Sequence, residues 1–292
     1  MKILVIGKNG QLASSLRNIL KDKLVTFSGK NDINLDDLDI IESEIIKINP
    51  EIIINTAAYT NVDGAEKQFE LASIINEKAS IEIAKASKKL NIPLIHISTD
   101  YVFDGSKIDE YSELDETRPL NKYGMSKLNG EIGISLNCSK AIIIRTSWLF
   151  SSYGNNFLKT IFKKIYNSDD LKVIHNQVGK PTSSLSLAKC IKEIVSSIEN
   201  GKKILKNEVY HFANYPHCSW YDFSLEIKTI MDKYIKSDSV IEPVNDDFFK
   251  QIAERPKSSI LCSNKIEMEF GIKKNYWSSY LETDIKNLIN NL

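Results

Sequence analysis

The chain has 292 residues, of which 42% are hydrophobic and 26% are charged, as is typical of a globular protein with a substantial core. Its 38 basic and 38 acidic residues balance, so no overall charge attracts nucleic acid or an anionic membrane surface. No stretch approaches the ~20 apolar residues of a membrane span, and neither the four cysteines nor the four histidines show metal-ligand spacing. We expect a cytoplasmic protein with free thiols, no metal, and no nucleic-acid or membrane partner.

The first residues predict a phosphate-binding turn. An apolar run at residues 3–6 ends at Gly7, and Gly10 precedes a helical pattern that reaches about residue 21. Gly7 permits a tight turn after a buried strand, and Gly10 lets a pyrophosphate approach the backbone at the helix N-terminus. Ala13 lies where the helix packs closely on the strand. This G-x-x-G-x-x-A pattern favours dinucleotide binding over an ordinary connection between a strand and a helix.

The end of the second predicted strand, at residues 24–27, favours NADPH. An NAD site usually places an acidic residue there, about 20 residues after the turn, to bind the ribose hydroxyls. This chain instead has Ser28-Gly29-Lys30-Asn31, which offers a hydroxyl and a cation to a 2′-phosphate. Asp32 follows closely, so a loop that folds back would keep NADH as an alternative.

Three further strands are predicted, and polar or small residues follow each of them. They span residues 51–55, 93–98 and 141–144. Because open parallel sheets bind ligands at the carboxyl ends of their strands, Thr99-Asp100-Tyr101 is a candidate site. A long helix predicted at residues 66–90 contains Asn76 among apolar residues, where a satisfied structural amide is commoner than a catalytic one.

Tyr123 and Lys127 form a candidate catalytic pair. Their spacing places both side chains on one face of a helix predicted at residues 122–137, after a polar loop at residues 104–121 that is expected to cover the site. A nearby ammonium favours tyrosinate and so prepares the phenol to give or take a proton. Such a match arises by chance about once in a chain of this composition. Its position downstream of Thr99 and opposite the glycine turn supports a chemical role.

The regular alternation of strands and helices weakens after about residue 150. We expect a Rossmann-like, doubly wound parallel α/β sheet in residues 1–150 and a smaller substrate-binding lobe in residues 151–292. Amphipathic patterns predict helices at about 220–235 and 277–290 in this lobe. Residues 209–212 are a candidate strand that returns to the main sheet.

Several blocks carry a family resemblance and run in order from residue 3 to about residue 260. They are Gly7-Lys8-Asn9-Gly10-Gln11-Leu12, Asn55-Thr56-Ala57-Ala58-Tyr59-Thr60-Asn61-Val62-Asp63, Ser98-Thr99-Asp100-Tyr101-Val102-Phe103, Pro119-Leu120-Asn121-Lys122-Tyr123-Gly124 with Ser126-Lys127, Arg145-Thr146-Ser147-Trp148, Gly154-Asn155-Asn156-Phe157 and Arg255-Pro256. Together they resemble the dTDP-4-dehydrorhamnose reductase family of the extended short-chain dehydrogenase/reductase superfamily.

The resemblance implies hydride transfer from NADPH to the C4 keto group of dTDP-4-dehydro-L-rhamnose, giving dTDP-L-rhamnose, a precursor of cell-surface polysaccharide. Thr99, Tyr123 and Lys127 would be the catalytic trio. Tyr123 would protonate the C4 oxygen, and Thr99 would hydrogen-bond the sugar carbonyl. Lys127 would bind the nicotinamide ribose and stabilise the tyrosinate left after proton transfer.

The same resemblance, joined to the patterns above, implies the binding residues. Asp100 would contact the sugar nucleotide through hydrogen bonds and Trp148 by stacking. For Arg255, diphosphate binding and a structural salt bridge remain equal alternatives. The residues expected to line the dinucleotide are Gly7, Gly10, Gln11, Leu12, Ser28, Lys30, Asp32, Ile33, Ala58, Tyr59 and Thr60, together with Tyr123 and Lys127.

The same resemblance leaves other functions open. Sugar-nucleotide dehydratases place Glu after Thr-Asp, but this chain has Tyr101 there, which favours reduction over elimination. An epimerase, or another sugar-nucleotide reductase, would need the same trio and stays an alternative. A non-catalytic NADP-binding subunit resembling the β subunit of methionine adenosyltransferase is also open, although the complete trio argues against it.

The oligomeric state is left open between a monomer and a homodimer. Some family members are described as dimerising through a metal held by carboxylates, one just after the glycine turn and one in a later helix. Here those neighbourhoods read Ala13-Ser14-Ser15 and Ser184-Leu185-Ser186, without acids. We therefore expect no metal-linked dimer.

Overall fold

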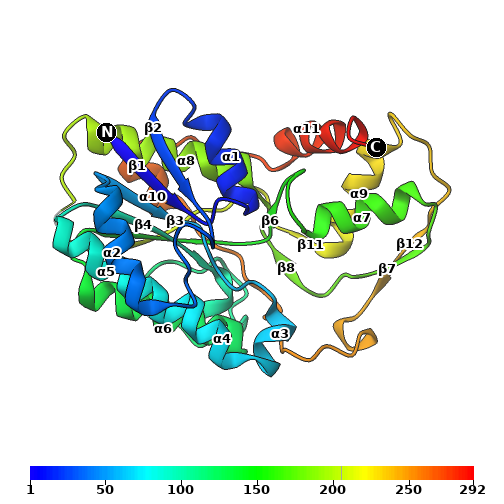
Figure 1. The fold of residues 1–292 in the computed structure, drawn as a ribbon. Coiled ribbons are helices and arrows are strands. Elements are labelled where there is room, and N and C mark those ends of the chain that lie inside the picture. The colour runs from blue at the N-terminus through cyan, green and yellow to red at the C-terminus, as the bar shows by residue number, and fades with distance from the viewer. Residues whose placement is uncertain (205) are drawn as a thin grey trace.

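A computed structural model describes residues 1–204 and 206–292 and confirms the predicted α/β class. Its centre is a six-stranded, wholly parallel sheet with the strand order β10-β5-β4-β3-β1-β2 (Figure 1). The strands are β1 (Lys2–Ile6), β2 (Leu24–Ser28), β3 (Ile52–Asn55), β4 (Leu94–Thr99), β5 (Ala141–Thr146) and β10 (Glu208–His211). The order reverses between β1 and β3, and such a switch point opens a ligand crevice at the carboxyl ends of the strands.

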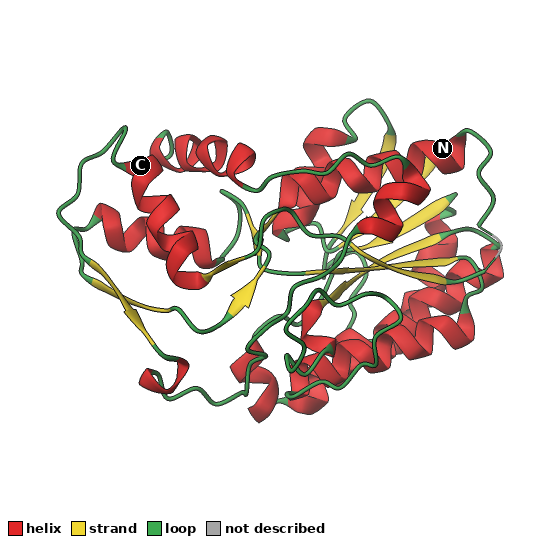
Figure 2. Ribbon diagram, turned by 180° about the vertical axis from the view of Figure 1, so that it is seen from behind, coloured by secondary structure: helices red, strands yellow, loops and turns green. Residues whose placement is uncertain are grey.

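The central strands of the sheet are buried on both faces, and most of their residues are apolar. Ile3 and Val5 face one core, to which α1 (Gln11–Ile19), α8 (Ser184–Glu199) and α10 (Asn264–Phe270) contribute. Leu4 and Ile6 face the opposite core, which is formed with α2 (Leu38–Ile48), α5 (Ala79–Leu90) and α6 (Lys122–Asn137). Figure 2 shows the strands between these two layers of helices. Two covered faces explain the continuous apolar runs that predicted the strands.

The long helix predicted at residues 66–90 is divided in the structure. Its parts are α3 (Val62–Lys67), α4 (Phe69–Ser73), the π-helix η1 (Ile74–Lys78) and α5. Gln68 has a non-helical backbone and separates α3 from α4. The π-helical turn contains Asn76, and such turns occur frequently at functional sites.

A smaller lobe lies beside the carboxyl edge of the sheet (Figure 1). Its core is shared by helices and by a parallel strand pair, which are α7 (Phe157–Tyr166), α9 (Trp220–Met231), α11 (Ser278–Ile289), β7 (Leu171–Ile174) and β12 (Ile241–Val244). Helices α9 and α11 agree with those predicted at 220–235 and 277–290. The remaining short elements are β6 (Leu149–Phe150), β8 (Val178–Gly179), β9 (Thr182–Ser183), β11 (Cys218–Ser219), and the 3-10 turns η2 (Asp100–Val102) and η3 (Asp246–Phe248).

The two parts of the molecule are interleaved along the chain. Helices α8 and α10 and strand β10 all follow residue 150, yet they pack on or pair with the main sheet. The structure therefore places parts of residues 151–292 in the main α/β unit, and residue 150 marks only where the chain first enters the smaller lobe. Within residues 1–204 and 206–292, no helix combines the length and the apolar character needed to cross a bilayer.

Candidate active site

The glycine turn after β1 is tightly constrained. Gly7 has a φ of +99°, and a Cβ there would lie 2.8 Å from both the Ala57 nitrogen and the Thr56 Oγ1. The Gly10 nitrogen donates to the Gly7 carbonyl over 2.9 Å, and α1 begins at the next residue. The first backbone N–H groups of a helix lack partners within it, so this turn can hold a phosphate.

The loop after β2 folds back onto the glycine turn. The Asp32 carboxylate accepts hydrogen bonds from the Gly29 nitrogen over 2.8 Å and the Lys8 Nζ over 2.9 Å, and the Gly29 bond holds the pKa of Asp32 below its usual value. The Ser28 side chain is buried, whereas the Lys30 side chain is 73% exposed. The Ser28 hydroxyl is thus enclosed, and the Lys8 and Lys30 ammonium groups are paired with Asp32 and Asp36. Binding of a 2′-phosphate by Ser28 or Lys30 remains a prediction.

The other residues predicted to line the dinucleotide occupy two kinds of position. The side chains of Leu12 and Ile33 are buried in the hydrophobic cores, which leaves only their backbone for a ligand. The segment Ala58-Tyr59-Thr60 follows β3 beside the glycine turn and is partly exposed. The Gln11 Oε1 accepts from the Ser151 Oγ over 3.0 Å, so this side chain joins the turn to the smaller lobe.

Asn76 has a role that sequence reasoning missed. Its Oδ1 accepts from the Tyr59 nitrogen over 2.8 Å, and its Nδ2 donates to the Tyr59 carbonyl over 3.0 Å and to the Ser126 Oγ over 2.9 Å. The side chain is a satisfied amide, as expected, but it also ties the predicted cofactor segment to the helix of the candidate catalytic pair. The only sequence feature that pointed to this role of Asn76 was a single polar residue among apolar ones in the predicted helix.

Thr99 and Tyr123 meet at the carboxyl end of β4. Tyr123 lies in the first turn of α6, which Asn121 caps by accepting from the Gly124 nitrogen over 2.8 Å. Burial raises the pKa of Tyr123 to about 12, and a hydrogen bond with the Thr99 side chain opposes that rise. The phenol is therefore neutral at physiological pH and can act as a proton donor.

Lys127 lies one turn further along α6 and is 2% exposed. Its Nζ donates to the Ile97 carbonyl over 2.7 Å and lies 3.3 Å from the His96 Nε2. Burial lowers the pKa of Lys127 to about 8, against the attraction of Glu131. The trio predicted from the sequence thus lies along β4 and the facing side of α6, and its catalytic roles remain predictions.

Asp100 offers an unused acceptor at this site. Its Oδ1 accepts from the Thr99 hydroxyl over 3.1 Å, whereas its buried Oδ2 lacks a hydrogen-bond partner within the described parts of the chain. Burial raises the pKa of Asp100 to about 6. Because buried acceptors are almost always paired, this oxygen suits a ligand hydroxyl.

A largely apolar cavity of about 580 Å³ lies between the smaller lobe and the tip of β4. The ring of Tyr101, which lines it, lies 5.6 Å from the Tyr123 ring between centroids, so the cavity adjoins the candidate proton donor. Sequence reasoning missed most of its walls because they come from separate segments. These additional residues include Phe157, Lys164, Lys172, Gln177, Trp220, Phe248, Phe249 and Gln251.

Trp148 lies behind a wall of this cavity. Its ring stacks on Trp220 at 3.4 Å between centroids and 5° between planes, and its backbone has a φ of +46°. On another side, a Cβ at Gly179 would lie 2.5 Å from the Trp148 ring. Trp220, rather than Trp148, lines the cavity, so stacking of Trp148 on a ligand remains a prediction.

Arg255 both forms a salt bridge and faces a cavity, so it has features of the two roles considered for it, a structural ion pair and diphosphate binding. Its Nη2 donates to the Asp63 Oδ2 over 3.0 Å, which forms a partly buried salt bridge between residues 192 positions apart. Arg255 also lines the 580 Å³ cavity. The salt bridge therefore does not remove the guanidinium from reach of a ligand.

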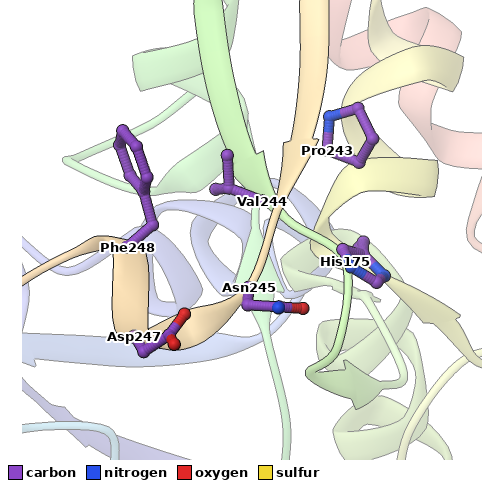
Figure 3. Close-up of a pocket in the computed structure, with 6 residues that line it drawn as sticks. All are labelled: His175, Pro243, Val244, Asn245, Asp247 and Phe248. Carbon is purple, nitrogen blue, oxygen red and sulfur yellow. The ribbon is translucent and has the colours of Figure 1, made fainter.

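A second, more open cavity of about 440 Å³ lies at the ends of β7 and β12 (Figure 3). His175, Asn245 and Asp247 contribute polar groups to it, and Phe248 contributes a ring. It contains none of the predicted catalytic or binding residues. In residues 1–204 and 206–292, moreover, no group of three or more His, Cys, Asp or Glu side chains could hold a metal ion.

Comparison with known proteins agrees with this geometry. A family model described as the RmlD substrate binding domain matches residues 1–290. A dTDP-4-dehydrorhamnose reductase of Aggregatibacter actinomycetemcomitans is 36% identical over 286 residues, which cover 96% of this chain and 97% of that protein.

Solved structures give the same result. A dTDP-4-dehydrorhamnose reductase from Clostridium acetobutylicum superposes with a TM-score of 0.91 at 34% identity, covering 99% of this chain and 100% of that one. A reductase of the same name from Bacillus anthracis, in complex with NADP, has a TM-score of 0.88 at 31% identity and full coverage of both chains. The resemblance inferred from the sequence blocks is confirmed: the chain belongs to the dTDP-4-dehydrorhamnose reductase family.

Proposed function

We propose that this protein reduces the C4 keto group of dTDP-4-dehydro-L-rhamnose to the alcohol of dTDP-L-rhamnose with NADPH. The single observation that carries the proposal is the position of the Tyr123 phenol, beside Thr99 at the tip of β4 and next to the Tyr101 ring that lines the 580 Å³ cavity. Family membership supports the substrate class, and the NADP complex of the Bacillus anthracis relative supports the cofactor.

The residues act on a keto group held between β4 and α6. The Thr99 hydroxyl turns from the Asp100 Oδ1 to donate its hydrogen bond to the C4 oxygen, and so orients the carbonyl. NADPH, when bound, supplies the hydride that reduces C4. The Tyr123 phenol donates its proton to the oxygen as negative charge develops there, and a charged Lys127 stabilises the resulting tyrosinate. The free Asp100 Oδ2 accepts a hydrogen bond from a sugar hydroxyl.

The nucleotide end of the substrate is assigned to the 580 Å³ cavity. Its aromatic walls, among them Trp220 and Phe249, suit stacking with a pyrimidine base. Arg255 at the same cavity can pair with the diphosphate, for which a planar guanidinium is well suited. Recognition of the base and of the sugar is thereby divided between the smaller lobe and the tip of β4.

A direct assay tests the proposed reaction. Purified protein mixed with NADPH and dTDP-4-dehydro-L-rhamnose should consume NADPH, followed at the nicotinamide absorbance, and NMR of the product should show a new C4 alcohol. A panel of other 4-keto sugar nucleotides defines the preferred base and sugar. Absence of consumption with every member of the panel would refute the proposal.

We also propose that any dimer forms without a linking metal and that the protein acts in the cytoplasm. Where carboxylates would be needed, the Ser15 and Ser184 hydroxyls lie 2.6 Å apart and buried between α1 and α8. Neutral serine hydroxyls that bond each other form a poor donor set for a cation. Sedimentation with and without EDTA should give the same mass, and cell fractionation tests the location.

A further inference from the structure

His96 is a buried titratable group that the proposed mechanism does not use. It lies in β4, fully buried, with its ring between Asn55 on β3 and Lys127 on α6. The His96 Nδ1 is 3.1 Å from the Asn55 Nδ2, and the His96 Nε2 is 3.3 Å from the Lys127 Nζ. The ring therefore connects the end of β3 with the candidate catalytic lysine.

The orientation of the Asn55 amide determines where the His96 ring carries its proton. The Asn55 Oδ1 accepts from the Ala57 nitrogen over 3.1 Å, so the NH₂ group of that amide faces the ring. The His96 Nδ1 must then accept a hydrogen bond. A neutral imidazole has one donor and one acceptor, and burial lowers the pKa of His96 well below its ordinary value, so the ring is neutral. Its proton consequently lies on Nε2 and points at Lys127.

This arrangement disfavours a charged Lys127. An ammonium group can only donate hydrogen bonds, and the protonated His96 Nε2 cannot accept one. A neutral amine can donate to the Ile97 carbonyl and accept from the ring through its lone pair. The neighbouring carboxylate that favours the charged form is Glu131, which is already paired with Arg145 over 2.6 Å.

The remaining titratable groups near Lys127 do not restore that charge. Tyr123 on the same helix is neutral at physiological pH. Asp100, beyond the tip of β4, bonds the Thr99 hydroxyl. The Arg145 guanidinium on β5 is a cation and cannot favour another one nearby.

We propose that His96 is a positioning residue for the reduction: Asn55 holds its ring proton on Nε2, and the ring thereby fixes the Lys127 amine and favours its uncharged form. The proposal rests on the proposed function for the role of Lys127 in turnover. This role explains why two polar residues, Asn55 and His96, are buried directly behind the segment that follows β3. The ring thereby limits the pH range over which Lys127 carries the charge that stabilises the tyrosinate.

Nitrogen NMR of protein labelled with ¹⁵N-histidine tests the tautomer without any substrate. The His96 signals should show a proton on Nε2 and none on Nδ1 at neutral pH. His96→Gln identifies these signals by their loss, and His211→Gln does the same for the other fully buried histidine. A proton on Nδ1, or on both nitrogens, would overturn the proposal.

The pH dependence of turnover tests the consequence for Lys127. In Asn55→Asp, the carboxylate accepts from Nδ1–H, so the ring proton moves and Nε2 can accept from the ammonium. The falling limb of kcat/KM for NADPH should then shift upward by about one pH unit, the scale of one hydrogen bond to a charged group. Asn214→Asp, at another buried amide, is the matched control and should leave the limb in place.

The same Asn55→Asp change, made in a variant that lacks the His96 ring, separates the effect of the ring from the effect of the added negative charge. In His96→Leu, the Asn55→Asp change should shift the limb less than it does in the wild type. An equal shift in both backgrounds would mean that charge alone acts, and would overturn the role of His96. If no sugar nucleotide is reduced, the proposed function fails, while the NMR measurement still decides the tautomer.

Discussion

Burial acts in opposite directions on the two ionisable groups of the candidate catalytic pair. It raises the pKa of Tyr123 to about 12 and lowers that of Lys127 to about 8. Both shifts favour the neutral form, because a buried charge loses its hydration. The phenol therefore keeps its proton at neutral pH, as a proton donor would need, and the Lys127 ammonium loses its proton as pH rises through about 8.

Removal of the phenol tests its role directly. Tyr123→Phe should lower kcat by roughly 10²- to 10⁴-fold, the usual contribution of a general acid, while NADPH still binds. Tyr166→Phe, at an exposed tyrosine on α7, should be nearly silent. Steady-state kinetics and a binding titration make the comparison. Near-normal turnover in Tyr123→Phe would remove this residue from the mechanism.

The pH profile should report Lys127 and Asp100. The Lys127 pKa is lowered, so its charge is lost as pH rises through about 8, and kcat/KM for NADPH should fall above that value. The Asp100 pKa is raised, so this carboxylate is protonated as pH falls through about 6, and the KM for the sugar nucleotide should rise below it. A profile that stays flat across this interval would contradict both assignments.

The preference for NADPH is expected to depend on the exposed lysines beside the glycine turn. Lys30→Ala should raise the KM for NADPH about tenfold, or ~1.4 kcal/mol, and leave the KM for NADH unchanged. Lys47→Ala is a matched control, because Lys47 is also exposed and paired with an acid but lies on α2. An unchanged ratio of the two KM values in Lys30→Ala would exclude this lysine from 2′-phosphate binding.

Helix α6 presents the candidate catalytic side chains on a single face. Tyr123, Lys127 and Glu131 are four residues apart, so all three side chains point toward β4 and β5. The position of the helix depends on contact with the π-helix η1. A Cβ at Gly130 would overlap the Asn76 carbonyl, so the two helices approach too closely for any side chain there.

Widening this contact should disturb both stability and turnover. Gly130→Ala is expected to cost about 1–3 kcal/mol, because the clash is with backbone that cannot rotate away. Ile132→Ala is the control, because Ile132 lies on the same helix at an exposed position. Denaturant unfolding and kcat give the two measurements. Equal losses in the two variants would show that the contact with η1 is not special.

Hydrogen bonds made by side chains at the mouth of the site join the two lobes of the molecule. Gln11, at the start of α1, donates to the Leu149 carbonyl over 3.3 Å and accepts from Ser151 and Asn156. Arg255 reaches across to Asp63, and the Asn121 cap of α6 donates to the Glu254 carbonyl over 2.8 Å. These bonds place the cavity wall against the candidate catalytic residues.

The salt bridge between Arg255 and Asp63 offers a test of what the guanidinium does. Arg255→Met should weaken binding of dTDP at least about tenfold, because charge-assisted bonds to the diphosphate are lost. Asp63→Asn also breaks the salt bridge but keeps the guanidinium, so its dTDP affinity should change little. Calorimetric titration measures both. Equal weakening in the two variants would leave Arg255 with a structural role alone.

The local sequence determined the fold class and much of the site. Apolar runs that end in glycine or small polar residues predict parallel strands and their ligand-binding ends, and the turn at Gly7 and Gly10 follows from backbone geometry alone. The helix predicted at residues 122–137 coincides with α6, so the alignment of Tyr123 with Lys127 was readable from spacing. These features depend on contacts between near neighbours in the chain.

How distant residues meet depends on long-range packing, which local patterns do not record. The pairing of Lys127 with His96, the bracing of Tyr59 by Asn76, and the cavity walls beside Tyr101 all join separate segments. Burial also separated residues that the sequence pattern had grouped together, since the Ser28 hydroxyl is enclosed while the Lys30 side chain is exposed and paired with Asp36. Local periodicity records which face of an element is apolar, but long-range packing determines what that face touches and which groups lose their water.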